Sequence, residues 1–300
     1  MLPWYGWLIG YNASTLQQVL VFNTAPTAGE ASIWQSGCGP AADASGYIYF
    51  NTGNGGFDAN TGGKDYGDSV VKLSPSGTVV DYFTPSDQAT LASDDIDLGS
   101  SGLVLLPDQP GTFTHVLVTG GKQGVIYSVD RDTGSMGKYN SPTYPNPIQS
   151  LAELSAGPTS GGLFGSPAYW NGYLYFSAWN DNVKAFQISN GLLTQTSSSS
   201  NKLAFPGSTP SVSSNGTTNG IVWIIEADVP NDTVITTPPT AILRAYDATN
   251  LANNELYDST QATGNRDAAG GAVKFAVPTI ANGKVYVGNS KQITVYGLLQ

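Results

Sequence analysis

The sequence is poor in charged residues, which make up 11 % of its 300 positions. An average globular protein has about 25 %, so the surface of this protein must consist largely of serine, threonine, asparagine and glycine. The charges are unbalanced, with 22 acidic against 12 basic side chains and a net charge of −10. Proteins that bind nucleic acids cluster Lys and Arg against the phosphates. We therefore expect no nucleic-acid partner, and favour calcium or a neutral or cationic small molecule as the ligand.

Cysteine and histidine are almost absent, with one of each, Cys38 and His115. A single cysteine forms no internal disulfide, and the two residues together cannot build a Cys/His zinc cluster. Cys38 lies in a glycine-containing turn, where we expect a small buried residue, and His115 starts a predicted strand, where we expect a structural role. A serine hydrolase is unsupported, because the sequence contains no Gly-x-Ser-x-Gly motif.

Long apolar runs are also absent. No stretch approaches the roughly 18 apolar residues of a membrane span, and residues 1–7 lack the basic region and apolar run of a signal peptide. We therefore expect a soluble chain that makes no membrane contact and carries no export signal of its own.

The sequence does contain a repeat. Each copy has a predicted strand, a glycine-containing turn, a strand rich in aromatic and β-branched residues, and then a third strand. Four copies begin at prolines, and a fifth keeps the pattern without one; they start at Pro40, Gly102, Pro167, Pro210 and Pro278. No stretch of helical period competes with this pattern, and 36 glycines and 18 prolines are spread along the chain as turn residues. Regular short strands with turn signals are typical of a β-propeller.

The repeat predicts an all-β fold, with residues 1–300 as one β-propeller domain of four-stranded antiparallel blades, about five of them visible. Residues 141–160, 194–202 and 228–240 lack a strand pattern and are predicted as surface loops. Both chain ends resemble part of a blade, so we expect a shared or incomplete closing blade. A second subunit that covers the open edge, and hence a homo-oligomer, is the alternative.

Four segments carry a resemblance to a known family. They occur in the family's order, and they are 48–54 (IYFNTGN), 68–73 (DSVVKL), 95–97 (DID) and 122–131 (KQGVIYSVDR). On these segments the chain resembles bacterial proteins with pyrroloquinoline-quinone (PQQ) repeats, which are related to quinoprotein alcohol dehydrogenases, without the amino-terminal blades of those enzymes. The resemblance implies a propeller fold and a secreted or periplasmic location.

The resemblance also implies a site. Asn54 matches the family's calcium-ligating asparagine, Asp95 matches the aspartate that serves as calcium neighbour and catalytic base, and Lys122 matches a basic residue that contacts the quinone. Calcium prefers such oxygen ligands and can polarise a bound carbonyl. The sequence departs from the family at Asp94, where a tryptophan is expected, and it lacks the glutamate ligand and much of the quinone cage, so a complete PQQ site is not expected.

Two acidic clusters are candidate sites in their own right. Asp58, Asp65 and Asp68 lie in a glycine-rich loop that resembles a calcium loop in part, although Ser69 stands where an EF-hand has its glutamate. The alternative is a set of Asx-turns. Asp95 and Asp97 lie before a strand and are candidates for a metal site or a general base, or for a solvated acidic turn. Lys122 has the alternative of a solvated hairpin lysine.

These residues leave three functional hypotheses. The first is a calcium-dependent enzyme that hydrolyses a small-molecule ester or lactone, with Asp95 or Asp97 as the base. The second is a PQQ-dependent dehydrogenase, and the third is a non-catalytic scaffold or ligand-binding propeller. The partner expected under all three is a small-molecule ligand or substrate.

Overall fold

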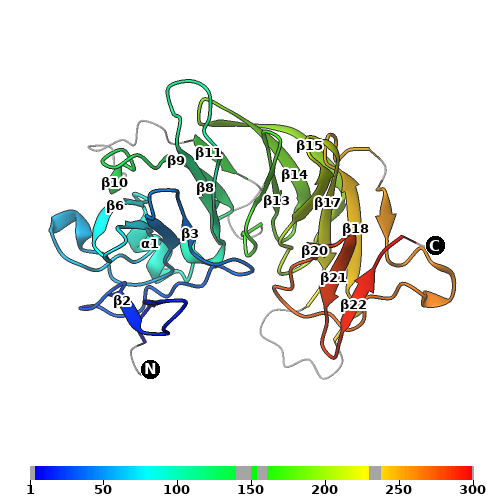
Figure 1. Ribbon diagram of the computed structural model, residues 1–300, viewed down its shortest axis with the longest axis horizontal. Coiled ribbons are helices and arrows are strands. Elements are labelled where there is room, and N and C mark those ends of the chain that lie inside the picture. Colours follow the sequence, from blue (N-terminus) through cyan, green and yellow to red (C-terminus); the bar gives the residue numbers. More distant parts are fainter. Residues whose placement is uncertain (1–3, 140–149, 154–160, 230–237, 254, 299–300) are drawn as a thin grey trace. The chain divides into compact units, whose positions relative to one another are not determined.

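The computed structural model of the chain describes residues 4–139, 150–153, 161–229, 238–253 and 255–298 (Figure 1). The chain divides into two compact units. Unit 1 comprises residues 1–152 and 189–192, and unit 2 comprises residues 153–188 and 193–300. Each unit is described by itself.

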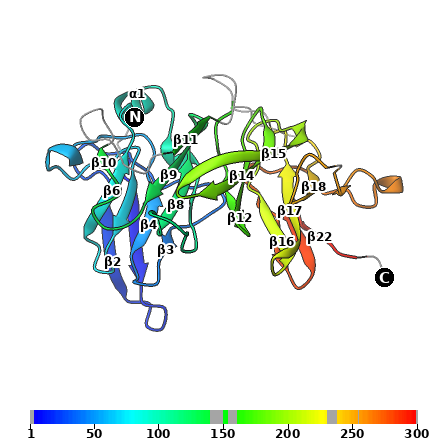
Figure 2. The same ribbon diagram turned by 90° about the horizontal axis from the view of Figure 1, so that it is seen from above.

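Unit 1 contains three sheets (Figure 2). The first is a two-stranded sheet of β1 (Trp7–Tyr11) and β2 (Gln18–Asn23). The second sheet is formed by β3 (Ala41–Ala42), β4 (Ile48–Asn51), β5 (Val70–Leu73) and β6 (Val79–Thr84), and β10 (Lys138–Tyr139) pairs parallel to β6 at its edge. The third is formed by β7 (Leu103–Leu105), β8 (Val116–Gly120), β9 (Val125–Asp130) and β11 (Ser150–Glu153). A short helix, α1 (Gln88–Ser93), and the 3-10 turn η2 (Leu98–Ser100) follow β6.

Unit 2 also contains three sheets. The first comprises β12 (Ala168–Trp170), β13 (Tyr173–Ser177), β14 (Asn182–Ser189) and β15 (Leu192–Lys202). The second comprises β16 (Ser211–Asn215), β17 (Thr218–Glu226), β18 (Ile242–Asp247) and β19 (Tyr257–Asp258). The last has three strands, β20 (Thr279–Ala281), β21 (Lys284–Gly288) and β22 (Ile293–Tyr296).

The sheets are arranged as the blades of a propeller within each unit. The strands of each sheet follow one another in chain order, and apart from β10 the pairings with a given direction are antiparallel. The first strands of consecutive sheets are neighbours: β3 contacts β7 in unit 1, and β16 contacts both β12 and β20 in unit 2. First strands meet in this way when blades are stacked around an axis. The predicted all-β fold of four-stranded antiparallel blades is confirmed, and all five copies of the repeat are sheets.

Aromatic and aliphatic side chains pack between neighbouring sheets. Tyr175 of β13 is fully buried, and its hydroxyl donates to the carbonyl of Ala248 (2.8 Å), which follows the next sheet's third strand. Gly220 of β17 lies under the indole of Trp170, where a Cβ atom would come within 2.7 Å of the ring. Only glycine allows this approach. Gly220, which was part of the repeat pattern in the sequence, therefore also allows the two sheets to pack closely.

Several expectations need correction or completion. The loop predicted at 194–202 is wrong, because β15 runs through it as an 11-residue strand, and β11 lies within the predicted loop 141–160. Cys38 is exposed, not buried. The first sheet has two strands and the last has three, and a blade shared between the chain ends stays a prediction. No helix in the described ranges is long and apolar enough to span a bilayer.

Candidate functional site

Three turns of unit 1 bring Asn54, Asp95, Asp97 and Lys122 together. Asn54 lies three residues after β4, the two aspartates lie between α1 and η2, and Lys122 lies in the turn between β8 and β9. Backbone hydrogen bonds hold the turns in register, since the Lys122 amide donates to the carbonyl of Asp97 (3.0 Å). Residues up to 68 positions apart thus form one cluster, which we call the Lys122 cluster.

The ammonium group of Lys122 is the centre of this cluster. Its Nζ lies 2.9 Å from the Asp95 carbonyl oxygen, 3.0 Å from Asp95 Oδ1 and 2.5 Å from Asp97 Oδ2. An ammonium group has three protons, so each of them has an acceptor here. The indole of Trp34 lies over the same group, 5.4 Å from Nζ to the ring centroid.

The ion pair between Lys122 and Asp97 is largely desolvated, since the two side chains are 17 % and 14 % exposed. Burial alone lowers the pKa of Lys122, but the hydrogen bonds and charges of Asp97 and Asp95 outweigh it, so the pKa is raised above the usual lysine value. The lysine is therefore a fixed positive charge at neutral pH, and the interpretation of Lys122 as a solvated hairpin lysine does not describe this geometry.

Asn54 binds both aspartates through nitrogen atoms. Its backbone amide donates to Asp97 Oδ1 (2.8 Å), and its side-chain Nδ2 donates to Asp95 Oδ1 (2.9 Å). Its Oδ1 is buried and has no hydrogen-bond partner. The approach of Asp97 depends on Gly53, because a Cβ atom there would lie 2.2 Å from Asp97 Oδ1. The glycine of the Thr-Gly-Asn segment therefore makes room for a carboxylate.

Asp95 differs from Asp97 in exposure and in backbone conformation. Its side chain is 81 % exposed, and its φ of +59° lies in the left-handed region that is unusual for residues other than glycine. Asp97, by contrast, has both carboxylate oxygens engaged, one by Asn54 and one by Lys122. Asp95 is thus the carboxylate of the cluster that solvent or a ligand can reach.

Asp68 contacts the backbone next to the Lys122 cluster, at Leu98, and does not bind Asp58 or Asp65. It is fully buried; its Oδ1 accepts from the backbone amide of Leu98 (3.1 Å), and its Oδ2 has no hydrogen-bond partner. Burial raises its pKa to about 7, against the lowering effect of the Leu98 amide. The carboxyl group therefore holds the start of η2, directly after Asp97.

Asp58 and Asp65 are engaged separately. Asp65 accepts from the backbone amides of Thr27 (2.9 Å) and Ala28 (3.0 Å), and Asp58 Oδ1 accepts from the amide of Asp65 (2.8 Å). The Asp58 contact lies within the loop, as the Asx-turn alternative expects. The Asp65 contacts instead join the loop to a segment 37–38 residues earlier in the chain. In the described part of the chain, no three His, Cys, Asp or Glu side chains form a group that could hold a metal ion. Calcium at this loop stays a prediction.

The residues of the Lys122 cluster, as placed, do not fit calcium. A calcium ion requires several oxygen ligands around one point, whereas here the Lys122 ammonium lies between the carboxylates and Asn54 turns its amide nitrogen toward Asp95. A quinone contact by Lys122 would likewise need a free ammonium proton, and all three already have acceptors. The cluster is a set of ion pairs around a cation that the chain itself supplies.

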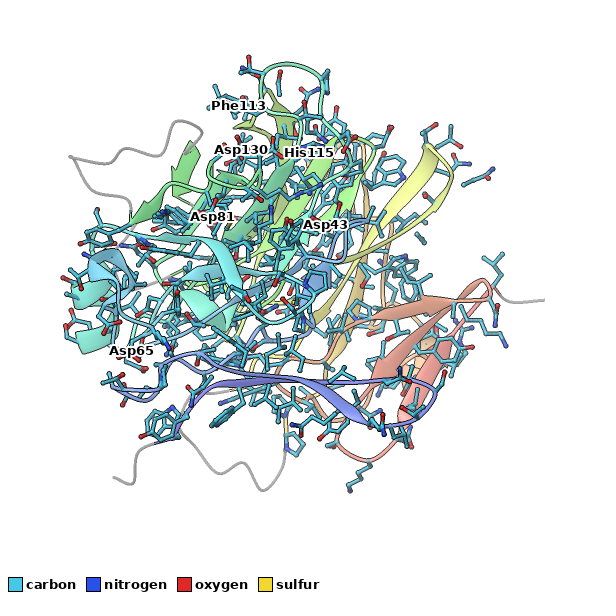
Figure 3. The ribbon with its side chains drawn as sticks, turned by 60° about the vertical axis from the view of Figure 1, so that its left-hand side comes forward. Asp43, Asp65, Asp81, Phe113, His115 and Asp130 are labelled. Carbon is cyan, nitrogen blue, oxygen red and sulfur yellow. The ribbon has the colours of Figure 1, made fainter. Side chains whose placement is uncertain are left out.

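A second polar network in unit 1 went unnoticed in the sequence. Tyr49 donates to Asp43 Oδ2 (2.9 Å), Arg131 lies 3.6 Å from the same oxygen, and Lys72 Nζ donates to the Arg131 carbonyl (2.7 Å). His115 belongs to the same end of the unit, where Figure 3 shows it near Asp130 and away from Asp65. Its Nδ1 lies 2.7 Å from Asp132, which is consistent with the structural role expected for it.

Comparisons with known proteins were made on the sequence and on the fold. No protein-family model matches the chain, and no curated protein matches it. Among solved structures, BamB from Moraxella catarrhalis is similar, at 15 % identity over 98 % of this chain and 79 % of that one, with a TM-score of 0.41. The β-propeller domain of Cps50 (Swd1) from Myceliophteria thermophila is 8 % identical over 91 % and 70 % of the two chains, with a TM-score of 0.45.

A europium-containing methanol dehydrogenase is also similar, at 14 % identity and a TM-score of 0.40. The match covers 95 % of this chain but 53 % of the dehydrogenase, so the chain spans about half the length of that enzyme. The fold assignment rests on the strand order and the strand contacts described above.

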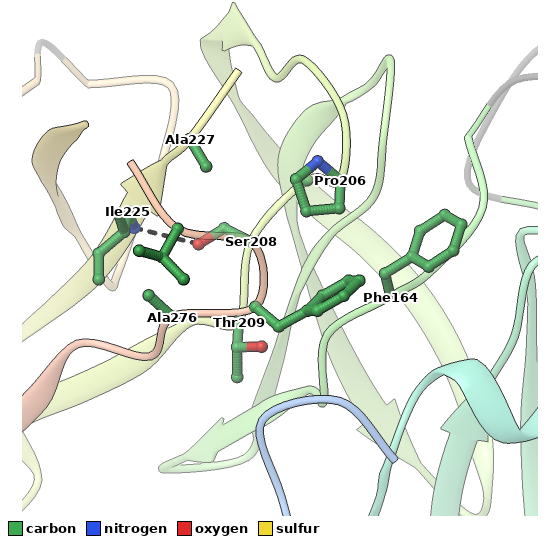
Figure 4. A pocket seen from close by; sticks show the side chains of 10 residues that line it. Phe164, Pro206, Ser208, Thr209, Ile225, Ala227 and Ala276 are labelled. Carbon is green, nitrogen blue, oxygen red and sulfur yellow. Dashed lines mark hydrogen bonds between the residues drawn. The ribbon is translucent and has the colours of Figure 1, made fainter. Parts of the chain in front are cut away.

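Unit 2 contains a small cavity lined by the end of β17 and by loop residues that precede β12, β16 and β20. Figure 4 shows its lining, in which Phe164, Pro206 and Ala276 surround the hydrogen bond from the Ile225 amide to Ser208 Oγ (3.0 Å). Its volume is about 10 Å³, which is near the lower limit for a single water molecule. The cavity is therefore too small for a substrate.

Proposed function

We propose that the chain is a non-catalytic, ligand-binding propeller of the PQQ-repeat type, in which Lys122 takes the place of a divalent cation. One observation carries this proposal: the three acceptors around the Lys122 ammonium are the oxygens of Asp95 and Asp97, the acidic segment that the family resemblance associates with calcium. A lysine in that position offsets one of the two negative charges without any bound ion and fixes three turns to one another. Export to the periplasm or the cell exterior belongs to the same proposal and rests on the resemblance.

The contacts of Asp97 support a structural role. A general base needs a lone pair directed at the proton that it removes. Both oxygens of Asp97 accept hydrogen bonds from the protein, one from Asn54 and one from Lys122. The same contacts give the carboxylate a clear task, which is to hold the Thr-Gly-Asn turn against the β8–β9 turn.

Calorimetric titration of calcium into chelator-treated protein tests the proposal. We expect no binding in the micromolar range, and the same melting temperature with and without chelator, because the Lys122 ammonium already occupies the position between the carboxylates. Asn54→Ala and Asp95→Ala serve as comparison variants. Micromolar binding by the wild type that disappears in both variants would contradict the proposal and place an ion at the cluster.

A calcium-dependent ester or lactone hydrolase is the second candidate function. Two observations favour it: Asn54 Oδ1 is buried without a partner, and the Asp95 carboxylate is open to solvent. Asp95 would then be the base, since Asp97 is enclosed. Turnover of simple lactones or esters that requires calcium and is lost in Asp95→Asn would establish this function. A visible absorbance band on reconstitution with PQQ would instead establish the quinone-dependent alternative.

A further inference from the structure

Unit 2 has an open groove beside its last strand, β22. The groove has a volume of about 580 Å³, and Thr294 to Leu298 form one of its sides. Three aromatic side chains line its interior: Trp223, Tyr257 and Tyr296. This volume lies within the range of about 300–1,000 Å³ that is usual for binding sites in proteins.

The groove follows the edge of an incomplete sheet. In the described ranges β22 pairs with β21 on one side and with no strand on the other. In two other sheets the third strand pairs antiparallel with a fourth, β5 with β6 and β18 with β19. The repeat itself therefore shows what covers this edge in a complete blade, namely an antiparallel strand.

The backbone of β22 is free to accept such a strand. The Asn289 amide donates to the Gln292 carbonyl at the hairpin turn (3.0 Å), and hydrogen-bonded pairs alternate along an antiparallel ladder. Ile293 and Val295 consequently direct their backbone N–H and C=O groups to the open edge. Their side chains are 67 % and 49 % exposed.

The segment that supplies β21 and β22 is basic in an acidic protein. Residues 263–300 contain one acidic residue, Asp267, and four basic ones, a net charge of +3 in a chain of net charge −10. Lys284 and Lys291 are exposed and lie at the two ends of the β21–β22 hairpin. Arg266 lies on the groove wall and is 56 % exposed, although it also pairs with Asp267. An acidic partner is favoured by this field.

We propose that β22 is a docking strand for an extended acidic peptide of another protein, which adds antiparallel to it and completes the sheet. Alternate side chains of such a peptide point to opposite faces, so apolar residues would fill the groove against the three aromatic side chains. The acidic residues between them would meet the basic groups at the strand ends. Addition of a strand to a sheet edge combines backbone hydrogen bonds with side-chain selection at alternate positions.

Fluorescence polarisation with a labelled eight-residue peptide of alternating valine and glutamate tests the proposal on the full chain. We expect saturable binding that weakens as salt is added, since the charges are exposed. The same peptide with a central proline should lose at least about tenfold in affinity, because it cannot donate to the ladder. A peptide with lysine in place of glutamate should not bind. Equal binding of all three peptides would overturn the proposal.

Two variants of the protein test whether the peptide binds at β22. Val295→Pro removes an N–H from the open edge, where proline is tolerated, and should abolish binding with little change in melting temperature. The double variant Lys284→Glu/Lys291→Glu should bind the peptide with lower affinity, and added salt should change that affinity less than in the wild type. Lys64→Glu is the matched control, an exposed lysine of unit 1, and should bind like the wild type.

A second copy of the chain is the competing occupant of the edge. Light scattering that shows a dimer, together with a Val295→Pro variant that is monomeric and a peptide that does not compete, would overturn the proposal in favour of self-association. This inference goes beyond the proposed function and uses none of its residues, so its failure would leave the outcome of the calcium titration unaffected.

Discussion

At the residue scale, what the candidate site can bind depends on which groups its charged side chains already pair with. The family resemblance assigned Asn54, Asp95 and Lys122 to one site, and Asp97 was a candidate from the acidic cluster, but the sequence did not show that the lysine lies between the carboxylates. Pairing of that kind depends on side-chain direction across three turns. Trp34 was missed for a simpler reason, because it lies in a stretch without a strand pattern and only its contact with Lys122 marks it.

Asp68 predicts an unusual pH dependence of stability. Its pKa in the folded protein is about 7, raised by burial from an ordinary value of 3.8. The folded state therefore binds the proton more tightly, and this group's contribution to stability is complete below about pH 4 and is lost as the pH rises through about 7. The contribution is at most about 4 kcal/mol.

Urea denaturation at pH 5 and pH 8 measures this effect. Wild-type protein should lose stability between the two values through Asp68, and Asp68→Asn, which keeps the shape without the charge, should lose less. Identical pH dependence in the two proteins would show that Asp68 does not titrate in this range.

At the element scale, the first three strands of each copy were predictable from the sequence, whereas some of the outer, fourth strands were not. Alternation of aromatic and β-branched residues with glycine turns located the first three strands of every copy, because these strands face neighbouring sheets on both sides. The strand β15 carries the segment Ser197–Ser200 and is largely polar, with several exposed positions. Its backbone pairing with β14 stabilises it, and hydrophobic pattern alone does not reveal such a strand.

Gly220 provides a test of packing between sheets. Gly220→Ala should destabilise the protein by about 1–3 kcal/mol, because the new methyl group would meet the Trp170 ring within 2.7 Å. Gly288→Ala is the matched control, since it lies in a strand of the last sheet and its Cβ would meet no atom within 4 Å. Equal free energies of unfolding for the two variants would contradict the packing described for β17.

At the scale of the whole molecule, charge is distributed unevenly. The chain has a net charge of −10, while its last 38 residues are basic, so partners of opposite charge can be bound at different places. Overall composition indicated the first fact but not the second, which appears only when the charges of residues 263–300 are counted separately. The propeller class was predictable from the repeat, whereas the function depends on contacts that no repeat specifies.

The central claim, that Lys122 serves as the built-in cation of the cluster, is tested most directly by calcium titration of Lys122→Met, with Lys64→Met as the control. Removal of the ammonium leaves the carboxylates of Asp95 and Asp97 beside the Asn54 amide without a counter-charge. We expect Lys122→Met to gain calcium binding and a calcium-dependent rise in melting temperature, while the wild type and Lys64→Met show neither. Calcium binding by the wild type that Lys122→Met leaves unchanged would contradict the claim.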